Sequence, residues 1–237
     1  GGGSLIEAIN LTGLFIDPNL GPAEDPLGLE VDREWDSYGI LSVGYALEVL
    51  GAAPLHPIHV VEDCGPSDLE RRLDSLDLGW LAWPSGSWID GWGTALHLNR
   101  RHHGSTDDAS MLFGWLATHQ RADSGMWGDH LGDEFGWLMA VNGFYRLTRG
   151  TYAQFGLDVP RPDRCIDTVL AHCRDNDWFS ALKRSASNRT ACNVLDVVHP
   201  LWLLGRQSDH RRDEIRAGVA AILTSVFTEW VDGQGFA

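Results

Sequence analysis

The sequence predicts an all-α protein in which antiparallel helical hairpins follow one another and form an incomplete ring. Two observations lead to this prediction. Segments with helical periodicity alternate between two kinds, one apolar nearly all round and the other with one apolar stripe and one charged face. A turn that combines glycine or asparagine with an aromatic residue also recurs, mostly at intervals of about 40 to 75 residues. Such alternation is expected of a ring with an inner and an outer set of helices.

The apolar segments are the predicted inner helices, because a helix without a polar face must be surrounded by protein. They cover residues 36–50, 90–103, 133–148 and 190–205. The amphipathic segments are the predicted outer helices, and they cover residues 67–78, 107–120, 162–174 and 209–230. Between these helices, residues 16–35 and 51–66 are predicted to be long loops over one rim of the ring.

The ring is expected to be incomplete at its end. Gly1 to Ser4 are typical of a linker or tag remnant, and residues 5–237 are predicted to form a single domain. The chain starts with the stub of an outer helix at residues 5–11 and stops at Ala237, where another inner helix should begin. We therefore expect either a domain truncated at its C-terminus or a second chain, as in a homo-oligomer, that completes the ring.

The composition narrows the classes of partner. The formal net charge is −15, which argues against nucleic acid and anionic membranes, because both require basic patches on the protein. No apolar run approaches the roughly 18 residues that a membrane span needs. The expected ligand is therefore a small molecule or an oligosaccharide, bound by a soluble protein.

The four cysteines show no C-x-x-C spacing, and we expect reduced, partly buried thiols instead of a disulfide framework or a metal site. This cysteine usage favours a cytoplasmic over a secreted protein. The cysteines are Cys64, Cys165, Cys173 and Cys192.

One segment resembles a known repeat. From Trp115 to Trp127 the sequence reads WLATHQRADSGMW, in which an aromatic-aliphatic pair is followed by Gln120 and then by Gly-x-Trp. This resembles the QW repeat of the α/α-toroid superfamily of terpene cyclases and protein prenyltransferases. The resemblance implies that Gln120 caps the end of an outer helix and that Trp127 packs beneath the following turn. The segment from Trp230 to Phe236 resembles a degraded copy of the same motif.

The chemistry of those enzymes is not implied for this chain. Terpene cyclases of this fold protonate their substrate with a D-x-D-D aspartate, which this sequence lacks. Prenyltransferases bind zinc through Asp-x-Cys and a distant histidine, and Asp163, Cys165 and His199 could be matched to that pattern. Asp163, however, opens a predicted outer helix and would face away from the cavity, so we expect neither a metal nor another cofactor. The same toroid also hosts glycan lyases and glycosidases, and fold alone does not decide among these activities.

The turns that lead into the inner helices carry acidic and aromatic residues, which would line one mouth of the ring. The acidic residues are Asp36, Asp90, Asp133 and Glu134, and the aromatic residues are Tyr38, Trp88, Trp92 and Trp127. Capping of helix N-termini accounts for part of the acidic set. It does not explain the accompanying aromatic residues, which are suited to stacking against a sugar ring.

Polar residues also lie within the apolar helices, where burial without a partner costs about 1–3 kcal/mol each. They include His97, Asn142, Asn193, Asp196 and His199. Asn193, Asp196 and His199 follow an i, i+3, i+6 spacing on one helix, and Pro200 is expected to kink or locally break that helix. A carboxylic acid beside an imidazole could supply general acid-base catalysis, although a satisfied structural network in the core is an equally good interpretation.

The leading hypothesis is a carbohydrate-active enzyme, either a glycoside hydrolase or a polysaccharide lyase. Its predicted acid-base residues are Asp90, Asp133, Glu134, Asp196 and His199, and its predicted substrate-binding residues are Asp36, Tyr38, Trp88, Trp92, His97, Trp127, Asn142 and Asn193. Two carboxyl groups suit hydrolysis, whereas a histidine with a tyrosine suits elimination. The alternatives are an isoprenoid cyclase or transferase without the D-x-D-D acid, and a binding module without catalysis.

Overall fold

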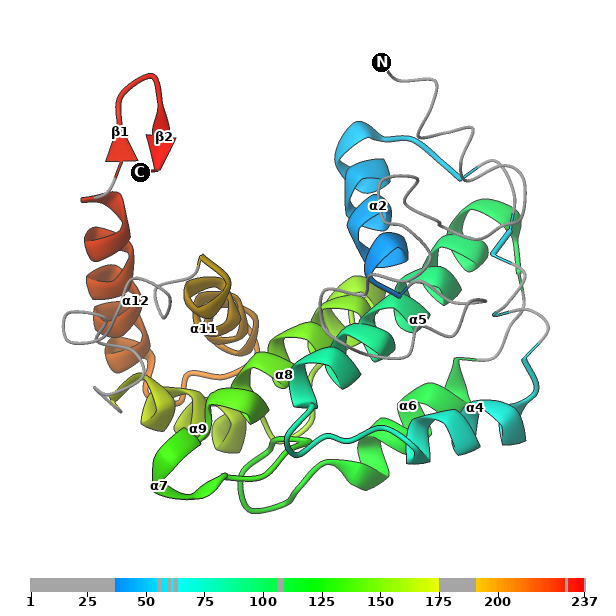
Figure 1. Cartoon of the computed structure of the whole chain (residues 1–237), viewed down its shortest axis with the longest axis horizontal. Coiled ribbons are helices and arrows are strands. Elements are labelled where there is room, and N and C mark those ends of the chain that lie inside the picture. The colour runs from blue at the N-terminus through cyan, green and yellow to red at the C-terminus, as the bar shows by residue number, and fades with distance from the viewer. Residues whose placement is uncertain are drawn as a thin grey trace.

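The computed structural model describes residues 37–54, 57–58, 61, 64–105, 109–174, 191–228 and 230–236 (Figure 1). These residues form an all-helical structure that ends in one short β-hairpin. Asp36 lies outside the described residues, and so do the side chains of Tyr38, Glu134 and Cys192. The predicted loop at 16–35 and the predicted turn at Asp175 to Phe179 are likewise outside them.

Each of the four apolar segments contains one long helix. These helices are α2 (Ser37–Leu50), α5 (Ala82–His103), α8 (Leu138–Thr148) and α11 (Ala191–Leu204). Helix α5 begins at Ala82 and not at residue 90, so Asp90 lies in the middle of the helix, and the prediction that it opens the helix is wrong. The predicted helix 133–148 is interrupted, because Gly136 has a φ of 54° and separates the four-residue helix α7 (Gly132–Phe135) from α8.

The amphipathic segments form α4 (Pro66–Asp74), α6 (Ser110–His119), α9 (Pro162–Arg174) and α12 (Arg212–Phe227). A π-helix, η1 (Arg149–Ala153), continues α8. The sequence did not predict the antiparallel hairpin of β1 (Trp230–Val231) and β2 (Gly235–Phe236). Helix α11 runs through Pro200, so the predicted break is absent. Within the described part of the chain, no helix is long and apolar enough to cross a membrane.

Glycines allow α5 and α8 to pack unusually close together. A Cβ atom at Gly86 would lie 2.6 Å from the carbonyl oxygen of Gly143, and one at Gly93 would lie 2.3 Å from that of Gly150. Both pairs advance in the same direction along the two helices, which therefore run parallel. This contact explains why Gly86 is helical, although its Ser-Gly-Ser-Trp sequence suggested a turn.

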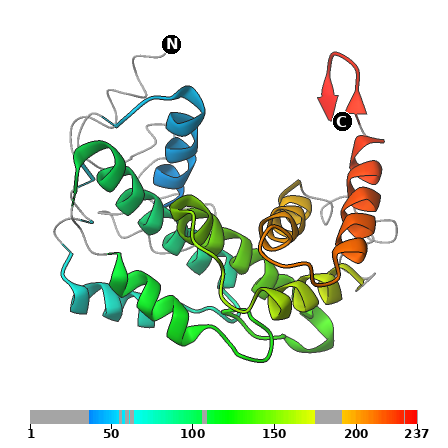
Figure 2. The same ribbon diagram turned by 180° about the vertical axis from the view of Figure 1, so that it is seen from behind.

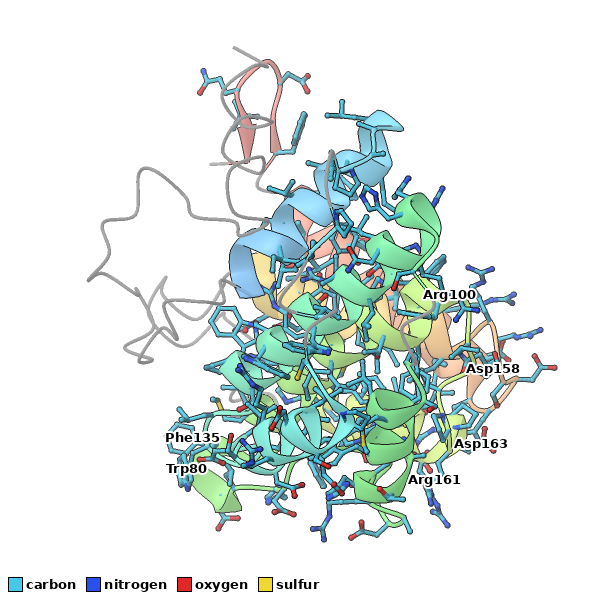
Figure 3. All side chains as sticks on the ribbon, turned by 90° about the vertical axis from the view of Figure 1, so that its right-hand side faces the viewer. Trp80, Arg100, Phe135, Asp158, Arg161 and Asp163 are labelled. Carbon is cyan, nitrogen blue, oxygen red and sulfur yellow. The ribbon has the colours of Figure 1, made fainter. Side chains whose placement is uncertain are left out.

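The side-chain view agrees with this parallel arrangement. Trp80 and Phe135, which precede α5 and α8, pack edge to face with ring centroids 5.1 Å apart. They lie at one edge of the molecule, whereas Arg100 near the end of α5 and Asp158 beyond η1 lie away from them (Figure 3).

The other apolar helices continue the parallel series. Helix α2 contacts α5, because a Cβ atom at Gly44 would lie 2.4 Å from the Thr94 side chain and Arg101 donates a 2.7 Å hydrogen bond to Glu48. Helix α11 packs on the other side of α8, where the rings of Tyr145 and His199 have centroids 5.3 Å apart. The helices α2, α5, α8 and α11 thus lie side by side in chain order (Figures 1 and 2).

Two pairs of amphipathic helices are also in contact. The indole nitrogen of Trp115 on α6 donates a 2.7 Å hydrogen bond to Asp74 on α4. Arg174 on α9 forms a 2.9 Å ion pair with Glu214 on α12. These helices lie along the outside of the apolar series (Figure 1).

The turn after α6 has the geometry that the QW-like motif implies. Gln120 is the C-cap of α6, and its side-chain amide donates to the carbonyl oxygens of Gly125 and Pro160 at 2.9 and 2.8 Å. The buried indole of Trp127 donates a 2.8 Å bond to the carbonyl of Leu116, at the end of the same helix. Gln120 thus ends α6, and Trp127 is buried against the end of the same helix.

Three of the four cysteines are described, and each is a free thiol, as predicted. Burial raises the pKa of Cys165 and Cys173 to about 12, so both thiols are protonated at neutral pH.

Substitution of Gly150 by alanine is expected to lower the free energy of unfolding by roughly 1–3 kcal/mol or more. The new methyl group would lie 2.2 Å from a carboxyl oxygen of Asp90 and 2.3 Å from its backbone oxygen. Urea denaturation followed by circular dichroism measures the effect.

The matched control is Gly114→Ala on α6, where a Cβ atom meets no other atom within 4 Å. This change should be neutral or stabilise the helix by up to about 1 kcal/mol. Equal stability of the two variants would contradict the close contact of α5 with α8.

Candidate functional site

Polar side chains gather where α5, α8, η1 and α11 meet. One face of α8 and η1 supplies four of them at an i, i+3, i+4, i+7 spacing: Asn142, Tyr145, Arg146 and Arg149. Helix α5 contributes Asp90, and α11 contributes Asp196 and His199. Five residues predicted from the sequence are therefore brought together or lie next to one another: Asp90, Asn142, Asn193, Asp196 and His199.

Asp90 and Arg149 form a buried ion pair. Asp90 is fully buried, and one of its carboxyl oxygens accepts hydrogen bonds from Nε, at 2.8 Å, and Nη2 of Arg149. Burial raises the pKa of Asp90, although the hydrogen-bonded guanidinium opposes that rise, and burial lowers the pKa of Arg149 less than its polar neighbours, Asp90 foremost, together raise it. Because both partners are removed from water, losing either one would leave an uncompensated buried charge.

Two tyrosines hold the other parts of the Arg149 guanidinium. Nη1 donates a 3.0 Å hydrogen bond to the hydroxyl of Tyr145. The guanidinium carbon lies 4.8 Å from the ring centroid of Tyr45 on α2 and 5.1 Å from that of Tyr145, within the range of cation–π attraction. Burial raises the pKa of both phenols, so both are neutral at physiological pH.

Asp196 is buried, and one of its carboxyl oxygens has no hydrogen-bond partner. In one orientation of its amide, Asn142 donates to the other oxygen at 3.3 Å, and in the opposite orientation it donates to Asn193 at 3.4 Å. Burial raises the pKa of Asp196 to about 7, against the opposing charges of Arg146 and Arg149. This carboxyl group can therefore carry a proton near neutral pH.

His199 lies one helical turn after Asp196 and is held by aromatic rings. Its ring packs edge to face on Tyr145, and Trp202 lies 5.8 Å away between centroids. Nδ1 is buried and has no hydrogen-bond partner. Burial, aided by the charge of Arg149, lowers the pKa of His199 to about 4, so the imidazole is neutral and can accept a proton.

Trp83 and Arg146 extend the cluster toward the start of α5. The guanidinium of Arg146 lies 5.2 Å from the ring centroid of Trp83 and 5.5 Å from that of Tyr145. The indole nitrogen of Trp83 is buried and has no hydrogen-bond partner. The cluster thus contains unpaired donor and acceptor atoms from three residues, Trp83, Asp196 and His199.

Pro200 contributes to the polarity of this part of α11. It has no N–H group, so it cannot donate the helical hydrogen bond that the carbonyl of Asp196 would otherwise accept.

The remaining predicted residues lie outside this cluster or within the core. Asp133 is exposed on α7. Trp92 is buried and stacks on Trp88 with ring centroids 5.0 Å apart. His97 lies 3.4 Å from a carboxyl oxygen of Glu48, on the contact of α5 with α2.

The cation–aromatic part of the cluster was not predicted from the sequence. A usable signal was present, because Tyr145, Arg146 and Arg149 share one helical face with Asn142 in an otherwise apolar segment. Arginines near the C-terminal end of a helix are commonly explained as partners of the helix dipole. That explanation gives no reason to expect the side chain to be buried.

The pattern matched to a zinc site has another structural explanation. Asp163 lies in the first turn of α9 and accepts a hydrogen bond from Ser208, and the thiol of Cys165 donates to the carbonyl of Gly125 at 3.2 Å. Among the residues that the structure describes, no three His, Cys, Asp or Glu side chains gather as metal ligands would.

A separate groove of about 470 Å³ lies between α4 and α6. Its lining includes Glu70, Met111, Trp115 and His119, and the His119 ring stacks on that of Trp115 at 4.1 Å between centroids. None of the predicted site residues lines this groove.

Comparison of the chain with protein-family models, with curated proteins and with solved structures gave no match. The arguments for function therefore come from the side chains of the cluster.

Substitution of Asp196 by asparagine is expected to raise the free energy of unfolding at pH 8 by about 1–3 kcal/mol and to change it little at pH 4. The pKa of Asp196 is raised in the folded state, so the folded protein keeps a proton that the unfolded chain releases. Its contribution to stability is thus lost as the pH rises from about 4 through about 7. Urea denaturation of both proteins at the two pH values measures this difference.

Asp133→Asn is the control, because Asp133 is exposed on α7. It should alter stability by less than about 0.5 kcal/mol at either pH. A stability gain in the Asp196 variant that is the same at pH 4 and pH 8 would contradict the raised pKa.

Proposed function

We propose that the chain is part of an α/α toroid and that it is a carbohydrate-active enzyme of the lyase type, with Asp196 and His199 as its acid-base pair. The observation that carries the proposal is the pairing of two unsatisfied buried atoms one helical turn apart. They are a carboxyl oxygen of Asp196, whose pKa is about 7, and Nδ1 of His199, whose imidazole is neutral.

The toroid is supported by the order of the helices. The apolar helices α2, α5, α8 and α11 pack side by side and run parallel, and the amphipathic helices lie outside them. In a ring of hairpins, all inner helices are expected to run in one direction and the outer helices in the other. The Gln120 cap and the Trp127 hydrogen bond add the turn that joins an outer helix to the next hairpin.

A carbohydrate ligand is supported by the mixture of groups in the cluster. Sugars present hydroxyls that both donate and accept hydrogen bonds, together with apolar ring faces. The cluster offers a donor at Trp83, acceptors at Asp196 and His199, and the aromatic rings of Tyr45, Tyr145 and Trp202. Tyr45 and Trp202 are 39% and 54% exposed, so their rings are accessible to a ligand.

The state of Asp90 favours elimination over hydrolysis. A glycosidase with two carboxyl groups requires one of them to be ionised and open to water or to the sugar. Asp90 is fully buried and bonded to Arg149, and Asp133 is exposed on the separate helix α7. Asp196 is buried as well, but one of its oxygens makes no hydrogen bond and its pKa is about 7, so it is the carboxyl group of the cluster that can supply a proton near neutral pH.

In the proposed elimination, neutral His199 removes the proton from the carbon next to the carboxylate of a uronic acid. The bond between the neighbouring ring carbon and the bridging oxygen breaks as the double bond forms between the two ring carbons, and protonated Asp196 delivers its proton to that leaving oxygen, which remains on the anomeric carbon of the next sugar. The positive charges of Arg146 and Arg149 would stabilise the negative charge that develops on the substrate. Between pH values of about 4 and 7, Asp196 is protonated and His199 is neutral, so the acid and the base are each in the protonation state that this step requires.

An isoprenoid enzyme is the second candidate, because the QW-like turn is the feature that such enzymes share with this chain. The charged cluster argues against it, since a carbocation cavity should be largely apolar. A binding module without catalysis is the third, in which the cluster is a structural network.

Activity is expected on oligosaccharides that contain uronic acids, with release of an unsaturated product. Ultraviolet absorbance of the new double bond and an assay of reducing ends follow the reaction. Asp196→Asn and His199→Gln should each lower kcat at least about 100-fold, because each removes one proton-transfer group. His119→Gln, on the outer helix α6, is the matched control and should retain the wild-type rate.

The outcomes separate the candidates. New reducing ends without ultraviolet absorbance would show hydrolysis and refute the elimination. Thermal stabilisation by prenyl diphosphates, with no turnover of glycans, would favour the isoprenoid enzyme. Absence of both turnover and stabilisation would refute both enzyme proposals and leave the binding module.

A further inference from the structure

The guanidinium of Arg149 is held on every side that the structure describes. Two of its nitrogens donate to one oxygen of Asp90, a third donates to the Tyr145 hydroxyl, and the rings of Tyr45 and Tyr145 pack against it. These contacts come from α2, α5 and α8, so three helices together fix the place of one positive charge. We name Asp90, Arg149, Tyr45 and Tyr145 the arginine clamp.

The backbone around the clamp is shaped to bring Asp90 and Arg149 together. Gly150 follows Arg149 directly, and a Cβ atom there would lie 2.2 Å from a carboxyl oxygen of Asp90. Arg149 also opens the π-helix η1, a wide turn that occurs frequently at functional sites. A glycine beside the arginine and an irregular turn at the same point are more than a structural ion pair requires.

The charge in the clamp acts on the proposed acid-base pair. Tyr145 links the two parts, because its hydroxyl accepts a 3.0 Å hydrogen bond from Arg149 and its ring packs on that of His199 at 5.3 Å between centroids. Burial shifts both pKa values most; Arg149 adds to the lowering for His199, and with Arg146 it limits the rise for Asp196. Of the described charged groups on elements packed against α11, these two arginines are the ones that act on Asp196. His199 responds to Arg149 and lies against the neutral Tyr145.

We propose that Asp90 is a positioning residue and not a proton-transfer group, and that it fixes the Arg149 guanidinium where its charge acts on Asp196 and His199. The catalytic meaning of this inference rests on the proposed function. The effect of the arginine clamp on the titration of Asp196 and His199 can nevertheless be measured without a substrate. The sequence predicted Asp90 to be an acid-base residue, whereas in this proposal Asp90 positions Arg149.

Asp90→Asn tests the proposal by the direction of a titration shift. The amide keeps the shape of the carboxylate but not its charge, so the guanidinium should leave its buried place past the partly exposed Tyr45. The titration midpoints of Asp196 and His199, followed by carbon-13 and nitrogen-15 NMR, should then both rise by about half a pH unit or more. Loss of the Asp90 charge alone, with Arg149 still in place, would lower both midpoints or leave them unchanged, and either result would overturn the proposal.

Two further variants keep the test decisive. Arg149→Gln removes the charge and should raise both midpoints at least as much as Asp90→Asn. Arg149→Lys keeps a positive charge but loses the planar fork and the stacking, and it should also raise both midpoints. If Asp90→Asn does not fold, unchanged midpoints in Arg149→Lys would overturn the proposal, because the position of the charge would then not matter.

Asp167→Asn is the control, since Asp167 is paired with His210 and Arg211 on the contact of α9 with α12 and should leave both midpoints unchanged. Activity distinguishes the two proposals. Upward shifts without turnover of any glycan would support the clamp and refute the proposed function. Turnover of a glycan without the shifts would support the function and refute the clamp.

Discussion

The close approach of α5 to α8 is the constraint on which the rest of the structure depends. Gly86 and Gly93 on one helix face Gly143 and Gly150 on the other, and a single added methyl group at these positions would meet backbone atoms. This proximity places Asp90 within bonding distance of Arg149. The pair then receives α2 against α5 on one side and α11 against α8 on the other. A wider spacing would separate the buried charges, and each would then lack a compensating partner in the interior.

The helical architecture could be predicted from polarity, because burial on all sides and burial on one side leave different patterns in a sequence. All four apolar segments and all four amphipathic segments contain the expected helices. The start of α5 and the break before α8 could not be predicted from those patterns. Gly86 suggested a turn because glycine is common in turns, whereas here it is required by a neighbouring backbone. Gly136 ends α7 by its positive φ, which polarity does not encode.

The candidate site was partly predictable, for a related reason. Asn142, Asp196 and His199 stand out as polar residues in apolar helices, and the structure places all three at the contact of α8 with α11. The charged partner Arg149 was missed because its sequence position, at the end of a predicted helix, offers a simpler explanation. Trp127 contributes to the core in a way that composition cannot reveal, since its hydrogen bond runs back from the turn to the carbonyl of Leu116 in α6. Large aromatic residues fill cores and line sites alike, and only their neighbours distinguish the two roles.

Because each apolar helix contacts mainly the next one along the chain, cooperativity in this molecule should decay with distance along the series, as it does in repeat proteins. The last helix, α12, has only Ile215 as a fully buried residue among its described positions, so opening should start there and reach α11 next. Such opening would separate Asp196 and His199 from α8 while Asp90 and Arg149 stayed joined within the more deeply packed part of the fold. We therefore expect the two halves of the candidate site to differ in local stability, with Asp196 and His199, the proposed acid-base pair, in the half that opens more readily.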